Sequence, residues 1–448
     1  MEFLGSHPGR RVLTYFAAAI LVGSAVLCLP VCSAGDPVSP IDAFFTATSA
    51  VCVTGLIVLD TGSDWSLFGQ IVILTLIQLG GLGIMTMASG LLLMIGSRPS
   101  FANRLGISQS LGSLRSPDSA TLVKAVVGTA LTIELIGALA LLAAFQSDMP
   151  LGEAAYCAVF HSVSAFCNAG FSTFPDSLER FASRPYVVLV FAVLIVLGGI
   201  GFVVIREVLD RIQGRTRRMS LHSHLCISAT LILLFGGATA FYLFESGGAL
   251  SHLGPVDRVC SALFQSVTTR TAGFNTFPQQ SLTEVSILLT LILMFIGACP
   301  GSTGGGIKTT TMAAILLRGW HRFRGRQSVP IFRRSISEDS VQRALSLFLL
   351  AVIAITALFA ALMFSQSRGE PHTLSHGWFV DHAFEAVSSF GTVGLSLGVT
   401  PELTVMGKLI TIVSMFTGRV GLLTLAFGLA RPPKRGELVH ADEQIMVG

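Results

Sequence analysis

The sequence predicts an all-α, multi-pass membrane protein. Of its 448 residues, 52% are hydrophobic and only 12% are charged, and the mean hydropathy is +0.72. Soluble proteins carry about 25% charged residues. Long apolar windows alternate with short inserts, and the inserts resemble one another in four places. This fourfold self-similarity predicts a fold built from four repeats.

The four inserts share an aromatic start, small residues in the middle and a terminal glycine. In each insert a Phe is followed four positions later by Ser or Thr, and a Gly with an apolar residue closes the segment. The inserts are residues 41–60, 158–171, 262–274 and 383–395. Their closing glycines are Gly55, Gly170, Gly273 and Gly394. In the third copy, the interval between the hydroxyl residue and the glycine is one residue shorter than in the others.

Eight apolar windows flank the inserts in pairs. They lie at about 11–33, 68–96, 121–146, 185–210, 221–246, 284–318, 340–366 and 404–431. A helix crosses the hydrocarbon core with about 20 residues, so each window can span once. The inserts are too short to span, which predicts re-entrant segments that line a cavity or are buried in protein. We therefore expect four helix–re-entrant loop–helix repeats with eight transmembrane helices around one pseudo-fourfold pore, in residues 1–97, 98–219, 220–335 and 336–448.

Basic residues are concentrated on one side of the predicted helices. Most of the 29 Lys and Arg lie near the N-terminus, in the tail, and in the loops at 97–124, 206–220 and 318–343. The positive-inside rule then predicts that both termini are cytoplasmic and that the inserts enter from outside. The outer side carries carboxylates such as Asp60 and Asp176, which would concentrate cations there, although ordinary solvated loops explain the same residues.

Motifs for other kinds of protein are missing from the sequence. No HExxH, GxSxG or paired-carboxylate pattern occurs, so we do not expect an enzyme. The eight cysteines show no metal-binding spacing and are expected to be core residues. The segment 299–308 is superficially similar to a phosphate-binding loop, but Ile307 stands where that motif needs Gly, so no nucleotide is expected to bind this chain. The lack of an Asn-Pro-Ala pair disfavours a water or glycerol pore.

The inserts predict a ring of carbonyl oxygens that binds a dehydrated cation. A half-helix that enters from outside presents the negative end of its dipole to the membrane centre. The backbone after it can direct carbonyl groups at a common axis. The side chains before the glycines differ among copies, so the backbone must coordinate the ion; tight re-entrant turns are the alternative explanation. The candidate filter residues are Cys52, Val53, Thr54, Gly55, Cys167, Asn168, Ala169, Gly170, Arg270, Thr271, Ala272, Gly273, Gly391, Thr392, Val393 and Gly394.

Two further features interrupt the apolar windows. Pro300 and the glycines around it predict that the helix at 284–318 breaks at 299–308. Arg419 lies within the last window, where a charged side chain is costly, so we expect it to face a polar lumen. A structural Arg419 bonded to a helix end is the alternative. Glu134 is compatible with either a buried, hydrogen-bonded carboxyl or an ion-pathway group.

The inserts, together with GSTGGGIKTTT (301–311) and GRVGLL (418–423), resemble the Trk/Ktr/HKT superfamily of K⁺ transporters, and the bacterial Ktr-type membrane subunit in particular. The resemblance extends from about residue 11 to the C-terminus, and the lack of an extra N-terminal hairpin favours the Ktr type over the Trk type. It implies K⁺ selectivity, which accompanies glycine at all four filter positions, and an intramembrane gate beneath the filter. The implied gate residues are Gly301, Ser302, Thr303, Gly304, Gly305, Gly306, Lys308 and Arg419.

The resemblance also implies partners and a location. Members are homodimers in the bacterial cell membrane, and they bind a cytoplasmic ring of RCK-type, nucleotide-binding regulatory subunits. The tail at 441–448 resembles the segment that helps hold the dimer. Lipid is the other expected contact, and no nucleic acid is expected. Arg270 is implied to point behind the filter towards an unidentified partner. Whether Na⁺ activates transport stays open, and an alternating-access symporter driven by H⁺ or Na⁺ is the alternative function.

Overall fold

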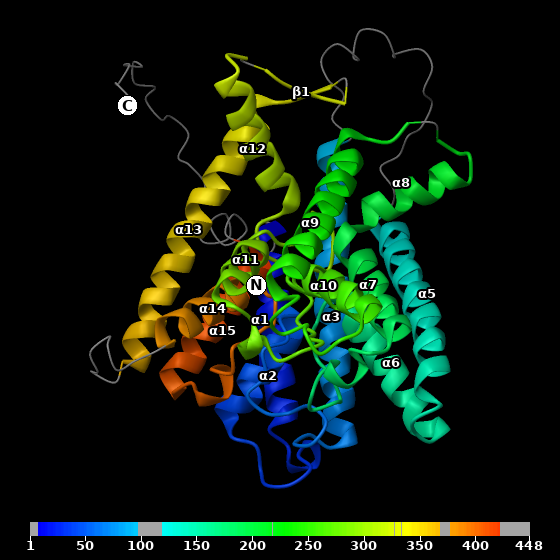
Figure 1. Cartoon of the computed structure of the whole chain (residues 1–448), viewed down its shortest axis with the longest axis vertical. Coiled ribbons are helices and arrows are strands. Elements are labelled where there is room, and N and C mark those ends of the chain that lie inside the picture. The colour runs from blue at the N-terminus through cyan, green and yellow to red at the C-terminus, as the bar shows by residue number, and fades with distance from the viewer. Residues whose placement is uncertain are drawn as a thin grey trace.

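A computed structural model describes residues 8–96, 119–216, 218–326, 328–332, 334–367 and 377–421, and these are mainly helical (Figure 1). The first half contains α1 (Pro8–Leu27), α2 (Pro40–Cys52), α3 (Leu67–Gly96), α5 (Ser119–Phe145), α6 (Leu151–Cys167), α7 (Pro185–Ile200) and α8 (Phe202–Ile212). The second half contains α9 (Leu221–Glu245), α10 (Pro255–Thr268), α11 (Glu284–Phe295), α12 (Thr309–Phe323), α13 (Glu338–Gln366), α14 (Trp378–Gly391) and α15 (Val405–Val420). Short 3-10 helices lie at η2 (Pro30–Cys32), η3 (Glu179–Phe181), η4 (Gln279–Ser281) and η6 (Thr400–Glu402).

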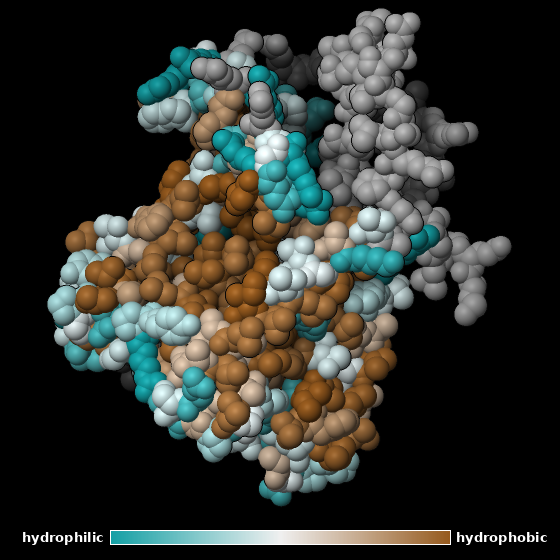
Figure 2. All heavy atoms as spheres, turned by 90° about the vertical axis from the view of Figure 1, so that its right-hand side faces the viewer, coloured by the Kyte–Doolittle hydropathy of each residue, from teal (hydrophilic) through white to brown (hydrophobic). Residues whose placement is uncertain are grey.

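Within the described ranges, five helices are long and apolar enough to cross a membrane, namely α1, α3, α5, α9 and α13. A sixth is reached if α7 and α8 together count as one span. Figure 2 shows a broad hydrophobic band across one face between hydrophilic ends. Exposed apolar side chains such as Leu135 on α5 and Ile353 on α13 suit contact with lipid. The expected all-helical, multi-pass membrane architecture is therefore confirmed.

Four short helices, α2, α6, α10 and α14, occupy the predicted inserts. They contain 13, 17, 14 and 14 residues, so each is too short to span. Each has an acidic residue in its first turn, where a negative charge stabilises the positive end of the helix dipole. These residues are Asp42, Glu153, Asp257 and Asp381. The Phe shared by the four copies is fully buried in each of them and anchors the helix: Phe45, Phe160, Phe264 and Phe384.

Two of the predicted spans differ from the sequence expectation. The window at 185–210 was expected to be one helix, but α7 ends at Ile200 and α8 leaves it at an angle of 103°. The bend lies at Gly201, which adopts φ +96° and ψ 140°, outside the helical region and accessible mainly to glycine. The window at 284–318 breaks as predicted. Its loop is longer than expected because α11 already ends at Phe295, and α12 begins at Thr309.

The basic loop at 318–343 contains a small hairpin that a purely helical prediction misses. Strands β1 (Val329–Ile331) and β2 (Arg334–Ile336) pair antiparallel, with Val329 opposite Ile336. The hairpin lies at the top of Figure 1, near the end of α12. Most of the predicted basic loop at 97–124, the end of the motif at 418–423 and the tail at 441–448 lie outside the described residues.

Candidate functional site

The four glycines that close the inserts meet in a closed ring. Each glycine faces a backbone carbonyl oxygen of the next copy, and this oxygen belongs to the residue just before the closing glycine of that copy. A Cβ atom on Gly55 would lie 2.5 Å from the carbonyl oxygen of Ala169, and one on Gly394 would overlap that of Thr54. The other two contacts join Gly170 to the oxygen of Ala272 at 2.9 Å and Gly273 to that of Val393 at 2.6 Å. The four segments therefore surround one axis, and no side chain fits at the glycine positions.

In every copy, the sign of the backbone angle φ alternates along the residues that form this ring. The glycines have φ values of +92°, +72°, +79° and +93° in chain order. The residues two positions earlier also have positive φ, which is uncommon for residues other than glycine. These are Val53 (55°), Asn168 (60°), Thr271 (72°) and Thr392 (49°). The residue between them has negative φ in each copy, so positive and negative φ values alternate along each segment. Four strained segments of this kind indicate a functional site.

The hydroxyl residue of each insert fixes the segment that follows it. The Oγ atoms of Ser49 and Ser388 accept hydrogen bonds of 3.1 Å from the backbone N–H of Gly55 and Gly394. In the second and third copies the hydroxyl instead donates to the carbonyl after the glycine. These bonds run from Ser164 to Phe171 at 2.7 Å and from Thr268 to Phe274 at 2.5 Å. The repeated Ser or Thr in the sequence thus has a bonding role in all four copies.

The candidate filter residues begin where the short helices end. Cys52, Cys167 and Gly391 are the last residues of α2, α6 and α14. The third copy differs because α10 ends at Thr268, and Thr269, whose backbone is in the right-handed helical region, lies between the helix and Arg270. There Arg270 is 6% exposed, and its Nη2 donates to Thr230 Oγ1 of α9 at 3.4 Å. The side chain of Arg270 therefore points behind the strand, and Thr230 is a partner that the sequence did not reveal.

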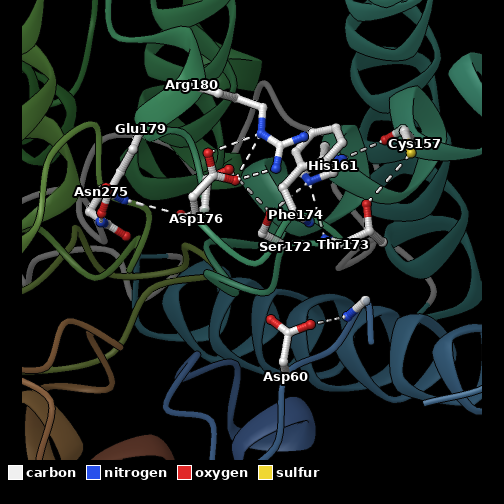
Figure 3. Close-up of polar contacts among 12 residues, drawn as sticks. Asp60, Cys157, His161, Ser172, Thr173, Phe174, Asp176, Glu179, Arg180 and Asn275 are labelled. Carbon is white, nitrogen blue, oxygen red and sulfur yellow. Dashed lines mark hydrogen bonds and ion pairs between the residues drawn. The ribbon is translucent and has the colours of Figure 1, made fainter. Parts of the chain in front are cut away.

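A vestibule of about 260 Å³ opens on one side of the glycine ring. Its lining includes the four glycines and the carboxylates of Asp60, Asp176 and Glu179. In Figure 3, Asp176 pairs with Arg180 at 2.6 Å, and Asn275 donates to Glu179 at 2.7 Å. Burial raises the pKa of Asp176, but the hydrogen bonds from Arg180 outweigh that effect and hold the pKa below its usual value. Burial raises the pKa of Glu179.

The glycine-rich loop between α11 and α12 packs directly against the candidate filter. A Cβ atom on Gly304 would overlap Thr271 Oγ1, and one on Gly305 would overlap Thr392 Oγ1. Thr303 Oγ1 donates to the carbonyl of Phe166, the residue before Cys167, at 3.1 Å. Only residues without a Cβ allow this close approach to the third and fourth copies.

The two cations predicted for the gate bind the carbonyl groups of this loop. Arg419 is 4% exposed; its Nη1 donates to the carbonyl of Thr303, and its Nη2 donates to that of Gly80 on α3 at 3.0 Å. Lys308 Nζ donates to the carbonyl of Gly304 at 2.7 Å. The remaining predicted gate residues, Gly301, Ser302, Gly305 and Gly306, belong to the same loop. Arg419 and Lys308 line a cavity of about 260 Å³ together with Gly301, Ser302 and Gly306.

A second set of glycines allows the flanking helices to approach the short helices. Three of these glycines are Gly80 of α3, Gly198 of α7 and Gly418 of α15. A Cβ atom on any of them would overlap a backbone carbonyl oxygen near the end of the preceding short helix, four residues before the candidate filter glycine. Those oxygens belong to Val51, Phe166 and Phe390. This geometry agrees with the interpretation of GGLG at 80–83 as close helix packing. In the third repeat, Gly297 faces Gly305 of the loop instead.

Glu134 is a buried, hydrogen-bonded carboxyl behind the second copy. It is 4% exposed, and it accepts a hydrogen bond of 2.8 Å from Gln78 Nε2. Cys167 donates to Gln78 Oε1 at 3.3 Å. Within the described ranges, no group of three or more His, Cys, Asp or Glu residues is arranged to hold a metal ion.

Comparisons with known proteins agree with this architecture. The fold is similar to the crystal structure of the potassium transporter TrkH from Vibrio parahaemolyticus, with a TM-score of 0.74 over 94% of this chain and 84% of that chain, at 22% identity. The sequence is 39% identical to the Ktr system potassium uptake protein B of Bacillus subtilis, over 98% of this chain and 97% of that protein. It is 37% identical to the potassium/sodium uptake protein NtpJ of Enterococcus hirae, with the same coverage.

The family model described as "TrkH: Cation transport protein" matches residues 15–434. This match confirms the resemblance inferred from the four inserts. It also confirms that the chain is a transporter and not an enzyme. The chain belongs to the TrkH family of cation transport proteins.

Proposed function

We propose that this protein takes up K⁺ through a pore whose selectivity filter is the ring of four inserts. The closed ring of glycines, with its alternating backbone, carries the proposal. Four sets of carbonyl oxygens around one axis can replace the hydration shell of a monovalent cation. The printed names of the Bacillus and Enterococcus relatives, both of which are potassium uptake proteins, support K⁺ as the ion.

The surroundings of the ring suit a cation. The C-terminal ends of α2, α6, α10 and α14 lead into the filter, so their dipoles place partial negative charge beside it. The vestibule adds the carboxylates of Asp60, Asp176 and Glu179, which raise the local cation concentration. In this proposal the vestibule faces the outside of a bacterial cell, and both termini are cytoplasmic. The four repeats are residues 1–97, 98–219, 220–335 and 336–448.

The loop at 296–308, with Arg419 and Lys308, is the proposed gate. Two observations support this proposal: the loop backbone packs tightly against the candidate filter, and both positive side chains bind carbonyl groups of the loop. Opening requires Arg419 to release the carbonyl of Thr303 and Lys308 to release that of Gly304. In this proposal the chain is a homodimer on a cytoplasmic nucleotide-binding ring that controls this step. The name of the Bacillus relative, protein B of a potassium uptake system, supports the existence of a partner protein.

Alternating access is the competing mechanism, with H⁺ or Na⁺ as the driving ion. It typically uses inverted repeats. The four short helices instead reach the ring in an arrangement where each copy contacts the next in the same sense, which favours a pore. The role of Na⁺ is a separate question, raised by the potassium/sodium designation of the Enterococcus relative.

The test is K⁺ uptake in a bacterium that lacks its own K⁺ uptake systems, with and without Na⁺, and with a Ktr-type regulatory subunit co-expressed. We expect this chain to restore uptake at low external K⁺. Purified protein in planar bilayers should then show discrete current steps. No uptake in any of these conditions would refute the proposed function, and saturating flux without current steps would favour alternating access.

A further inference from the structure

The residue that follows the shared Phe is polar and buried in every copy of the insert. These residues are Thr46 (2% exposed), His161 (0%), Gln265 (0%) and Glu385 (0%). Such side chains are seldom fully buried, and when they are, they usually have hydrogen-bond partners. Their types differ completely, so the shared feature is the position one residue after the Phe.

Three of the four side chains bind the loop that leaves the filter in their own copy. His161 Nε2 lies 3.0 Å from Ser172 Oγ and accepts a bond of 3.4 Å from the N–H of Thr173, as Figure 3 shows. Its Nδ1 lies 2.7 Å from the carbonyl of Cys157, which fixes the ring on its own helix. In the third copy, Gln265 Nε2 donates to Gln279 Oε1 at 2.7 Å. In the fourth copy, the carboxyl group of Glu385 accepts from Ser396 Oγ at 2.9 Å and from Thr400 Oγ1 at 2.7 Å.

These bonds connect the two ends of each filter strand. The strand begins at the end of the short helix, which carries His161, Gln265 or Glu385. It ends at the exit loop, which carries the bonded partner. Three of those partners, Ser172, Gln279 and Ser396, also line the vestibule above the glycine ring. The bonds therefore run behind the strand and fix the vestibule wall relative to the helix.

The first copy lacks this connection. Among the described residues, Thr46 Oγ1 has no hydrogen-bond partner. In this copy Asp60 instead forms bonds within the exit loop itself, where its Oδ1 accepts from the N–H groups of Gly62 at 3.0 Å and Ser63 at 2.8 Å. Three copies therefore have a side-chain bond between the short helix and the exit loop, and the first copy has none from Thr46. The first copy can serve as a control for the other three.

We propose that His161, Gln265 and Glu385 are positioning residues for ion selectivity, and that Glu385 has the largest effect. His161 and Glu385 each bond two separate residues of their exit loops, but only Glu385 accepts both bonds with a carboxyl group, and hydrogen bonds to a charged group are the stronger kind. The proposal rests on the filter function proposed above and specifies how the ring keeps its diameter. Where selectivity comes from the size of the ion cavity, the carbonyl groups must be held in place.

The test is a double-mutant cycle of Glu385→Gln and Thr400→Val, with KM, maximal uptake and the K⁺/Na⁺ uptake ratio measured at matched protein levels. We expect each single variant to change the K⁺/Na⁺ ratio by about tenfold, the effect of one hydrogen bond to a carboxyl group. The double variant should change the ratio by less than the sum of the two single variants, because Glu385→Gln weakens and Thr400→Val removes the same bond from Thr400 to the side chain at position 385. Thr46→Val is the matched control, and its ratio should equal that of the wild type.

A second measurement separates this inference from the proposed function. The thermal stability of the purified protein is measured in Na⁺, K⁺, Rb⁺ and Cs⁺, which reports ion binding without transport. Glu385→Gln should flatten the preference among these ions, whichever ion the wild type prefers. An unchanged preference, or fully additive effects in the cycle, would refute the positioning role even if the wild type takes up K⁺. Failure of uptake by the wild type refutes only the function.

Discussion

At the scale of single residues, the filter glycines matter because of both conformation and space. Gly55 has φ +92°, and a Cβ atom there would lie 2.5 Å from the carbonyl oxygen of Ala169 and 3.0 Å from the Cα of Gly170. Both neighbours are backbone atoms of the next copy, so they cannot move aside as a flexible side chain would. A side chain at Gly55 must therefore displace the neighbouring filter segment.

Gly55→Ser should consequently lower the K⁺/Na⁺ uptake ratio by about tenfold or more, since backbone strain of this kind costs about 1–3 kcal/mol. The ratio is measured with the uptake assay described above. Gly152→Ser is a suitable control because Gly152 lies at the start of α6 with no atom within 4 Å of its Cβ position. Unaltered selectivity in Gly55→Ser would argue strongly against the filter assignment.

The sequence predicted these glycines but missed other residues at the same scale. The glycine positions could be read because they recur in register with a Phe and a hydroxyl residue. Thr46, His161, Gln265 and Glu385 recur equally well but share no residue type, so a search for similar residues passes over them. Their partners lie in exit loops whose path only the three-dimensional structure shows. Thr230, the partner of Arg270, lies 40 residues away for the same reason.

At the scale of elements, the loop between α11 and α12 depends on a side chain from another repeat. Arg419 of α15 binds the carbonyl of Thr303 in this loop and the carbonyl of Gly80 on α3. The equivalent positions in the first and second repeats are Gly81 and Gly199, each directly after the packing glycine. The fourth repeat therefore supplies an arginine that connects the loop to the first repeat.

Arg419→Gln removes these bonds and one positive charge, so the loop should leave its closed position more readily. We expect K⁺ uptake that is higher, or less dependent on the regulatory subunit, than in the wild type. Arg322→Gln controls for loss of a charge, because Arg322 is exposed in the last turn of α12. If uptake and its regulation are the same in Arg419→Gln as in the wild type, Arg419 has only a structural role.

Some element boundaries could not be predicted from local sequence. GGLG at 80–83 and GGIG at 198–201 are nearly identical, yet α3 continues through the first and α7 ends within the second. The difference is a tertiary contact. Phe202 N donates to the carbonyl of Gly301 at 3.0 Å. A Cβ atom on Gly201 would lie only 2.6 Å from the carbonyl oxygen of Pro300. Contact with the loop at 296–308, the proposed gate, therefore explains why α7 ends at this motif while α3 continues through the other.

At the scale of the whole molecule, the ring is complete only because the first and last repeats meet. Gly394 faces the carbonyl oxygen of Thr54. Nearby, Lys408 Nζ of α15 lies 2.6 Å from Asp42 Oδ1 of α2, with side chains only 14% and 18% exposed. The likeness of the four inserts was readable from the sequence. Their order around the axis, and this pair 366 residues apart, were not.

The Asp42–Lys408 pair should therefore stabilise the closed ring more than an ordinary surface ion pair does. Lys408→Gln leaves a mostly buried carboxylate without its partner, so we expect unfolding to become easier by about 2 kcal/mol, between the values for exposed and fully buried pairs. Thermal unfolding in detergent measures this change as a lower midpoint. Arg206→Gln, which breaks the more exposed pair with Asp210, should change the midpoint far less.

Exchanging the charges, Asp42→Lys with Lys408→Asp, should recover only part of the loss, because a positive side chain in the first turn of α2 would then oppose the positive end of the helix dipole. Full recovery would mean that the dipole is unimportant here, and no loss in Lys408→Gln would mean that the ring closes through backbone packing alone.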